Sequence, residues 1–134
     1  ATVVPAPAPP HVARRRRVVV ADDIDDVAWA LSAALKAWGH DVDTVADGAG
    51  LLALVERDRP EVAIVDLGMP GLSGYDVAER LRATERGRGM LLVAVTGWGG
   101  EGDRERSLKA GFDAHLVKPV SAEALCALID DWNP

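Results

Sequence analysis

Cysteines, histidines and long apolar runs are scarce in this sequence. It has one cysteine, Cys126, and three histidines, so it can form no internal disulfide and offers no Cys/His cluster that would favour zinc. No apolar stretch approaches the roughly 18–20 residues that cross a bilayer, and the N-terminus lacks the apolar core of a signal peptide. These absences exclude a disulfide-stapled scaffold and predict no membrane contact by this segment. The single cysteine fits a reducing compartment such as the cytoplasm.

Acidic residues outnumber basic ones. The 134 residues carry 21 acidic and 15 basic side chains, a net charge of −6, and their 49% hydrophobic content is ordinary for one globular domain. The block Arg14–Arg17 concentrates positive charge directly before an apolar strand pattern. We interpret it as a solvent-exposed, solubilising segment that precedes that strand. We predict no nucleic-acid partner, because the rest of the chain is acidic.

Residues 1–15 predict a proline/alanine-rich linker with a basic end. Segment 1–13 holds four of the eight prolines, interleaved with alanines, and such a stretch forms an extended, semi-rigid connection rather than a core. A folded domain is therefore predicted over 16–132. Because the sequence begins with Ala1 rather than Met, we expect it to be a piece of a longer protein.

Strand and helix patterns alternate along the folded part. Apolar runs predict strands, and apolar residues at helical spacing predict helices. The predicted strands are 17–22, 41–46, 61–66, 90–95 and 113–117, and the predicted helices are 25–38, 48–58, 74–84, 102–110 and 121–131. Helix 102–110 is the weakest, since only Leu108 and Ala110 are apolar enough to be buried.

The order of the strands in the sheet follows from their composition. Strands 17–22, 61–66 and 90–95 have wholly apolar bodies and are predicted to be central, whereas the other two have the character of edge strands. This alternation predicts an α/β, flavodoxin-like (βα)5 doubly wound fold, with a five-stranded parallel sheet in the order 2-1-3-4-5.

Polar side chains stand where four of these strands end. Asp22-Asp23 follow the first strand, Asp66 closes the third, Thr96 follows the fourth and Lys118 the fifth. A parallel sheet brings these strand ends to one edge, where open α/β folds bind ligands. Three carboxylates together require a compensating cation, and an oxygen-only site suits Mg²⁺. Metal, ammonium and hydroxyl together would stabilise a phosphoryl group, with Asp66 as nucleophile.

These motifs, taken in order, resemble the receiver domain of two-component response regulators over roughly residues 16–132. Segment 66–74 is similar to the family pattern Asp-Leu-x-Met-Pro-x-x-x-Gly. The resemblance implies that Asp66 is the phospho-acceptor. It also implies that Asp23 binds Mg²⁺ directly, Asp22 binds it largely through water, and Gly68 contributes its backbone carbonyl.

The resemblance further implies a switch and a cis peptide bond. Thr96 matches the switch hydroxyl, and Lys118-Pro119 matches a pair whose peptide bond is usually cis. His115 stands where the family commonly has Tyr or Phe, which puts an aromatic switch in doubt. Two interpretations stay open for His115, a pH-sensitive switch and a plain, partly exposed ring. Gly68 and Trp98 occupy positions that tune phosphoryl lifetime in the family.

The leading functional hypothesis is a phospho-receiver in a two-component or phosphorelay system. Its partner would be a histidine kinase or a histidine phosphotransfer domain. We expect the receiver of a hybrid histidine kinase, cytoplasmic and either free or tethered to a membrane-bound kinase; a stand-alone single-domain regulator is the alternative. The rivals are a Mg²⁺-dependent phosphohydrolase, which lacks a general acid at Gly68, and a degenerate receiver used only for binding.

Other polar and aromatic residues have simpler interpretations. Asp25 and Asp26 are helix-start charges, His11 and His40 are surface residues, and Cys126 is a packing residue. Trp132 is expected to cover the end of the sheet. On helix 25–38 the predicted core stripe is Val27, Leu31, Ala34, Leu35 and Trp38. Trp29 falls off that stripe and is either a surface outlier or a docking residue.

Overall fold

The computed structural model describes residues 15–97 and 101–133. The proline-rich segment up to residue 14, His11 and Trp98 lie outside the described residues, so the predictions made for them stay predictions. None of the described helices is both long enough and apolar enough to cross a bilayer.

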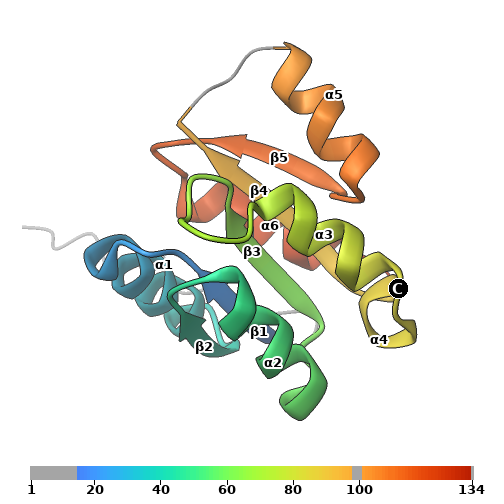
Figure 1. Ribbon diagram of the computed structural model, residues 1–134. Helices are drawn as coiled ribbons and strands as arrows, with labels where there is room; N and C mark the ends of the chain where they lie inside the picture. The colour runs from blue at the N-terminus through green and yellow to red at the C-terminus, as the bar shows by residue number, and fades with distance from the viewer. Residues whose placement is uncertain (1–14, 98–100, 134) are drawn as a thin grey trace, which may run out of the picture.

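Five parallel strands form one sheet in the order β2-β1-β3-β4-β5 (Figure 1). In chain order the elements are β1 (Arg17–Ala21), α1 (Asp25–Ala37), β2 (Asp41–Val45), α2 (Gly48–Asp58), β3 (Val62–Asp66), α3 (Gly74–Arg82), α4 (Glu85–Arg88), β4 (Leu91–Thr96), α5 (Glu101–Ala110), β5 (Ala114–Val117) and α6 (Ala122–Asp131). The flavodoxin-like fold and strand order predicted from the sequence are confirmed.

Helices cover both faces of the sheet and enclose two apolar cores. Helices α1 and α6 pack over one face, and α2, α3 and α5 over the other (Figure 1). Every residue of β3 and β4 is buried, whereas β2 is largely exposed. Cys126 lies fully inside the α1/α6 core, and burial raises the pKa of its thiol to about 11, which confirms it as a packing residue.

Helix 74–84 is shorter than predicted, and a short helix follows it. Helix α3 ends at Arg82, and the Thr84 hydroxyl caps α4 by accepting the Gly87 N–H at 3.0 Å. A Cβ atom at Gly87 would lie 1.8 Å from the Leu81 carbonyl oxygen, so only glycine allows this close turn. The sequence prediction missed α4 because four residues are too few to show a helical period.

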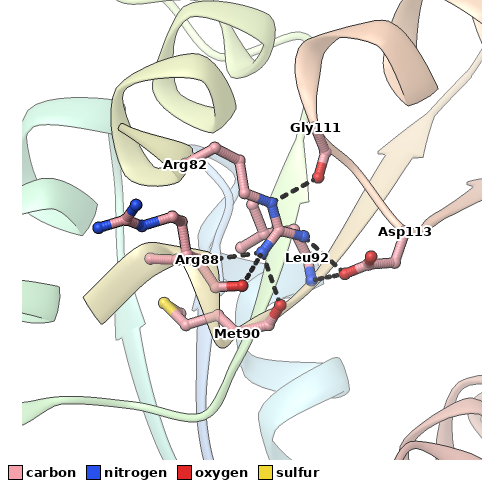
Figure 2. A network of polar contacts seen from close by, with 7 residues as sticks. Arg82, Arg88, Met90, Leu92, Gly111 and Asp113 are labelled. Atoms are coloured by element: carbon pink, nitrogen blue, oxygen red, sulfur yellow. Dashed lines mark hydrogen bonds and ion pairs between the residues drawn. The ribbon is translucent and has the colours of Figure 1, made fainter. Parts of the chain in front are cut away.

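Arg82 holds several elements together at the N-terminal end of β4, whereas the polar residues stand at C-terminal strand ends; Figure 2 shows the contacts of Arg82. Its guanidinium donates to the carbonyl oxygens of Gly87, Met90 and Gly111, each at 2.8 Å, and contacts an Asp113 oxygen at 2.7 Å. The same Asp113 oxygen accepts the Leu92 N–H at 2.9 Å. One side chain therefore joins α3, α4, the start of β4 and the turn into β5.

Two residues predicted to lie in solvent are buried instead. Arg16 is only 5% exposed; its guanidinium donates to Glu61 at 2.9 Å and lies 4.7 Å from the centre of the Trp132 ring. His40 is 3% exposed, and its Nδ1 accepts the Arg16 backbone N–H at 3.0 Å. These predictions were wrong because tertiary partners satisfy both groups, and local sequence does not show those partners.

The buried faces of two helices also differ from prediction. On α1 the fully buried residues are Ala28, Ser32 and Leu35; of the expected stripe, Leu35 is buried and Leu31 and Trp38 pack against the core partly exposed, so the stripe is confirmed in part and shifted toward Ala28 and Ser32. On α5, Leu108 is 52% exposed and Ser107 is buried in its place, while Ala110 is buried as expected. Trp132 packs at the edge of the α1/α6 core and stacks on Arg16.

Candidate functional site

The structure brings the predicted acidic residues together. Asp66 ends the central strand β3 and is 6% exposed, and Asp22 follows β1 and is 3% exposed. Asp23 lies beside them on the surface, and one carboxylate oxygen from each of the three lies within 4.8 Å of the others. The cluster therefore stands at the carboxyl ends of two neighbouring central strands, β1 and β3.

Backbone contacts fix the two buried carboxylates. The Asp22 N–H donates to the Val45 carbonyl at 3.0 Å, and its Oδ1 accepts the Ile24 N–H at 2.9 Å. The Oδ1 atom of Asp66 accepts the Gly68 N–H at 2.9 Å. One oxygen of each carboxylate is thus held by the backbone, and the second is left to face the site.

Lys118 provides positive charge to both of the remaining oxygens. Its ammonium lies 3.3 Å from Oδ2 of Asp66 and 3.7 Å from Oδ2 of Asp22. The Lys118 N–H donates to the Thr96 carbonyl at 2.7 Å, which joins the ends of β4 and β5, and the Lys118–Pro119 peptide bond is cis.

The charge of the cluster favours a cation. Burial is the largest influence on the Asp22 carboxyl and raises its pKa; the neighbouring Asp66 charge raises it too, whereas the Ile24 hydrogen bond and Lys118 lower it. Three ionised carboxylates and one ammonium leave two negative charges (three minus one) at the edge of the sheet. An all-oxygen donor set with that residual charge fits a hard divalent ion such as Mg²⁺.

Glycines keep the space around Asp66 open. A Cβ atom at Gly68 would lie 3.5 Å from Oδ1 of Asp66, at ordinary contact distance, and one at Gly97 would meet nothing within 4 Å. Thr96, the last residue of β4, is 7% exposed. Neither position 68 nor position 97 therefore places a side chain over the carboxylate.

His115 lies on β5, away from the carboxylates. It pairs in register with Ala94, is 9% exposed, and its Nδ1 lies 2.9 Å from the Ser107 hydroxyl on α5. The interpretation of His115 as a plain, partly exposed ring is wrong, because the ring is buried and hydrogen-bonded. Sequence reasoning missed Ser107, since a polar helix such as α5 shows no apolar period that would indicate its inner face.

Trp29 stands outside the cluster. Its side chain is 73% exposed on α1. On another face of the same helix, an apolar groove lies between α1 and the turn after β5; it is lined by Asp26, Val27, Ala30, Leu31, Val95, Lys118, Pro119 and Val120, and Trp29 is not among these residues. The structure thus places an exposed aromatic ring on the helix that forms one wall of this groove.

A buried acid at the centre of a parallel α/β sheet, with two further acids and a lysine around it, defines a class of phosphoryl-accepting domains. The chain belongs to the response regulator receiver domain family, which matches residues 18–130. It takes part, as such domains do, in two-component signalling, and the recognition made from the sequence is confirmed.

Similar proteins support this assignment. Response regulator PleD of Caulobacter vibrioides is 34% identical over 113 residues, which cover 84% of this chain and 25% of PleD. The probable transcriptional regulatory protein TcrX of Mycobacterium tuberculosis is 37% identical over 106 residues, 79% of this chain and 44% of TcrX. The chain thus spans between a quarter and a half of the length of these curated relatives.

Solved structures share the fold closely. The receiver domain of sensor histidine kinase PA1611 from Pseudomonas aeruginosa PAO1, with magnesium in its active-site cleft, has a TM-score of 0.81 and 30% identity, covering 89% of this chain and 98% of that one. Chemotaxis response regulator CheY4 of Vibrio cholerae has a TM-score of 0.81 and 25% identity, covering 87% and 97%.

Proposed function

We propose that Asp66 accepts a phosphoryl group from a phosphohistidine with the help of Mg²⁺. The donor would be a histidine kinase or a histidine phosphotransfer domain. The observation that carries the proposal is the contact between Lys118 and the buried Asp66 carboxylate, 3.3 Å apart, beside Asp22 and Asp23. A buried carboxylate that contacts one lysine and lies among further acids is suited to binding a cation and a negatively charged phosphoryl group.

The chain's residues have distinct roles in this step. An Asp66 oxygen forms a bond to phosphorus while the phosphorus–nitrogen bond of the donor breaks and its electron pair returns to the imidazole. Lys118 stabilises the negative charge of the incoming phosphoryl oxygens, and the Thr96 hydroxyl would donate to one of them once the group is bound. Asp22, Asp23, Asp66 and the Gly68 carbonyl would hold Mg²⁺, which when bound neutralises phosphoryl charge.

The domain would also catalyse loss of its own phosphoryl group. Water attacks phosphorus, the bond to the Asp66 oxygen breaks, and inorganic phosphate leaves while the carboxylate is restored. The absence of a side chain at Gly68, whose Cβ would lie 3.5 Å from Oδ1 of Asp66, supports this water access. The domain turns over no free substrate in this scheme, because Asp66 itself is the group that reacts.

Labelling by a small phosphodonor tests the central role. With Mg²⁺ present, intact mass should show one added phosphoryl group, and Asp66→Asn should abolish it. The matched control is Asp47→Asn, which removes a charge from the same chain but keeps an acceptor for the Gly50 N–H that caps α2. If Asp66→Asn is labelled like the control, the acceptor lies elsewhere and the proposal fails.

The partner would use the apolar groove beside Lys118. A helix that carries phosphohistidine must bring its imidazole to Asp66, and the groove between α1 and the turn after β5 is the apolar surface bordering that position. Trp29 is exposed on the same helix, and a large aromatic side chain is suited to anchoring a partner. We therefore extend the proposal to Trp29 as a docking residue.

The surrounding protein also remains a proposal. Similarity to the PA1611 kinase receiver supports the receiver of a hybrid histidine kinase, and similarity to CheY4 supports a stand-alone regulator. The coding sequence upstream of Ala1 distinguishes them, because a kinase ATP-binding domain there would establish the hybrid. The linker over 1–15, the domain limits 16–132 and the cytoplasmic location stay predictions.

A further inference from the structure

Two glycines at the start of helices lie where a side chain would not fit. Gly48 is the first residue of α2 and Gly74 the first residue of α3, and both are buried. A Cβ atom at Gly48 would lie 2.6 Å from Cγ2 of Val77 and 3.1 Å from Cβ of Leu72. A Cβ atom at Gly74 would lie 2.5 Å from Cδ2 of Leu67 and 3.2 Å from its Cα. Both glycines therefore allow other parts of the chain to come close.

Gly48 is not required by its backbone conformation. Among the described residues the glycines with a positive φ are Gly39, Gly71 and Gly111, so Gly48→Ala would meet no backbone strain of that kind. Alanine also has a higher helix propensity than glycine. Space, rather than chain flexibility, therefore accounts for a glycine at the start of α2.

Part of that space is taken by the loop that leads away from Asp66. Loop 67–73 joins β3 to α3 and includes Gly68, whose carbonyl would hold Mg²⁺ in the proposed function. The beginning of the loop is fixed by two hydrogen bonds. The Gly68 N–H donates to Oδ1 of Asp66 at 2.9 Å, and the Leu67 N–H donates to a carbonyl of β4 at 2.9 Å.

The far end of the loop lies against α2. Leu72 is partly buried and packs on the core that α2 and α3 cover, and Gly48 is its neighbour from α2. Between Gly68 and Leu72 the chain bends at Pro70, whose ring fixes φ, and at Gly71, which has a φ of 81°. Because this short bend has few free torsions, a displacement of Leu72 should also displace the Gly68 carbonyl.

The turn before α2 also holds the second buried acid. The Val45 carbonyl accepts the Asp22 N–H at 3.0 Å, and the side chain of Asp47 caps the first turn of α2. Segment 45–48 therefore contacts the surroundings of the acidic site in two places, at the Asp22 backbone and at loop 67–73.

We propose that Gly48 is a positioning residue for the metal site. The close approach that it allows between α2 and Leu72 places loop 67–73 so that the Gly68 carbonyl faces the acidic cluster. Gly48 itself touches neither the metal nor the phosphoryl group and acts through the loop. The inference rests on the proposed function, because that function assigns the Gly68 carbonyl to Mg²⁺, and it adds the residue that sets the position of the loop.

The alternative is that Gly48 only makes room in the core. Val77 is fully buried on α3, and its Cγ2 is the atom nearest to the position of a Cβ at Gly48. Gly48→Ala would then displace α3 and lower the melting temperature without a change at the acidic site. Stability responds in both cases, whereas the Mg²⁺ affinity of the folded protein responds only if the loop moves.

Magnesium affinity is therefore the first measurement. A titration with magnesium chloride, followed by the amide NMR signals of Gly68 and Asp23, should give a Kd about ten-fold higher in Gly48→Ala than in the parent, as expected when a group that orients a metal ligand is changed. Val77→Ala is the matched control, because it leaves a void at the same contact and should keep the parent's Kd. Gly102→Ala controls for the substitution itself, since nothing lies within 4 Å of a Cβ there. An unchanged Kd in Gly48→Ala, or an equal rise in Val77→Ala, would overturn the positioning role.

The second measurement needs no metal. In the metal-free protein the Gly68 amide proton should move upfield in Gly48→Ala, because displacement of the loop lengthens its hydrogen bond to Asp66. The same signal should stay in place in Gly102→Ala. A Gly68 signal that is identical in Gly48→Ala and the parent would show that the loop has not moved, and the proposal would fail.

Labelling by a small phosphodonor separates this inference from the proposed function. At limiting Mg²⁺ Gly48→Ala should be labelled more slowly than the parent, and at saturating Mg²⁺ the two rates should agree, because only metal affinity has changed. Slowing by the same factor at both concentrations would contradict a role in placing the metal ligand. Absence of labelling in the parent would remove the proposed function, and the Mg²⁺ titration would still decide whether Gly48 positions the loop.

Discussion

Replacing Arg82 by lysine should destabilise the domain without altering the acidic site. The guanidinium reaches the carbonyls of Gly87, Met90 and Gly111 and the Asp113 carboxylate at once (Figure 2). A lysine ammonium is a point charge on a flexible stem and cannot span acceptors arranged around a planar fork. We therefore expect the lysine of Arg82→Lys to make one or two of these hydrogen bonds and to leave the other acceptors without a donor.

The size of the effect follows from the hydrogen bonds that a lysine cannot make. Hydrogen bonds to charged groups contribute about 1.5–3 kcal/mol each, but water can reach this network, since the Arg82 and Asp113 side chains are 22% and 46% exposed. With that discount we expect the free energy of unfolding to fall by about 3 kcal/mol. For a domain of this size the melting temperature should fall by roughly 10 °C.

Urea unfolding followed by tryptophan fluorescence measures the change. Arg88→Lys is the matched control, because Arg88 belongs to the same cluster through its carbonyl but its own side chain is exposed. That variant should change stability by less than about 0.5 kcal/mol. If Arg82→Lys behaves like the control, water replaces the guanidinium and the fork geometry has no importance. Labelling of Asp66 in folded Arg82→Lys should equal the parent's, because Arg82 lies at the opposite edge.

Three further predictions concern the site, an internal histidine and the docking face. Mg²⁺ should raise the melting temperature of the parent through binding to the native state, and Asp23→Ala should lose most of that response; an unchanged response would show a wrong ligand set. Burial lowers the pKa of His40 below its ordinary 6.5, so the unfolded chain binds the proton more readily. Stability should therefore fall as pH drops from 6.5 through the lower folded pKa, and His40→Gln, titrated in parallel, should remove that slope. Trp29→Ala should slow transfer from the cognate phosphohistidine partner but leave labelling by a small phosphodonor normal; equal slowing of both would make Trp29 structural.

The acidic site could be predicted from sequence because its residues follow buried strands. Parallel strands have equivalent ends, so an acid after β1 and an acid ending β3 must share an edge once the strand order is known. Asp22, Asp66 and Lys118 accordingly lie within contact of one another, as the distances show. This inference requires only the apolar runs that predict the strands and the rule that connections between parallel strands are right-handed.

The buried polar groups could not be predicted in the same way. Arg16 and His40 look like surface residues in sequence. Arg16 contacts Glu61 and Trp132, which are 45 and 116 residues away, and His40 accepts the Arg16 backbone N–H. Ser107 likewise becomes an inner residue only because His115 lies beneath it. Such pairs obey no local period, so a sequence pattern carries no signal for them.

Apolar burial is distributed unevenly among the elements that carry the site. Asp66 and Asp22 end central strands that are packed on both faces, so their carboxylates have little freedom. Lys118 follows an edge strand with neighbours on one side only, and that strand supports α5, the long helix with the smallest apolar attachment among the described residues. The acids of the site are therefore carried by central strands and the lysine by an edge strand. Elements with little apolar burial open first, so the amides of β5 and α5 should exchange hydrogen faster than those of β3 and β4.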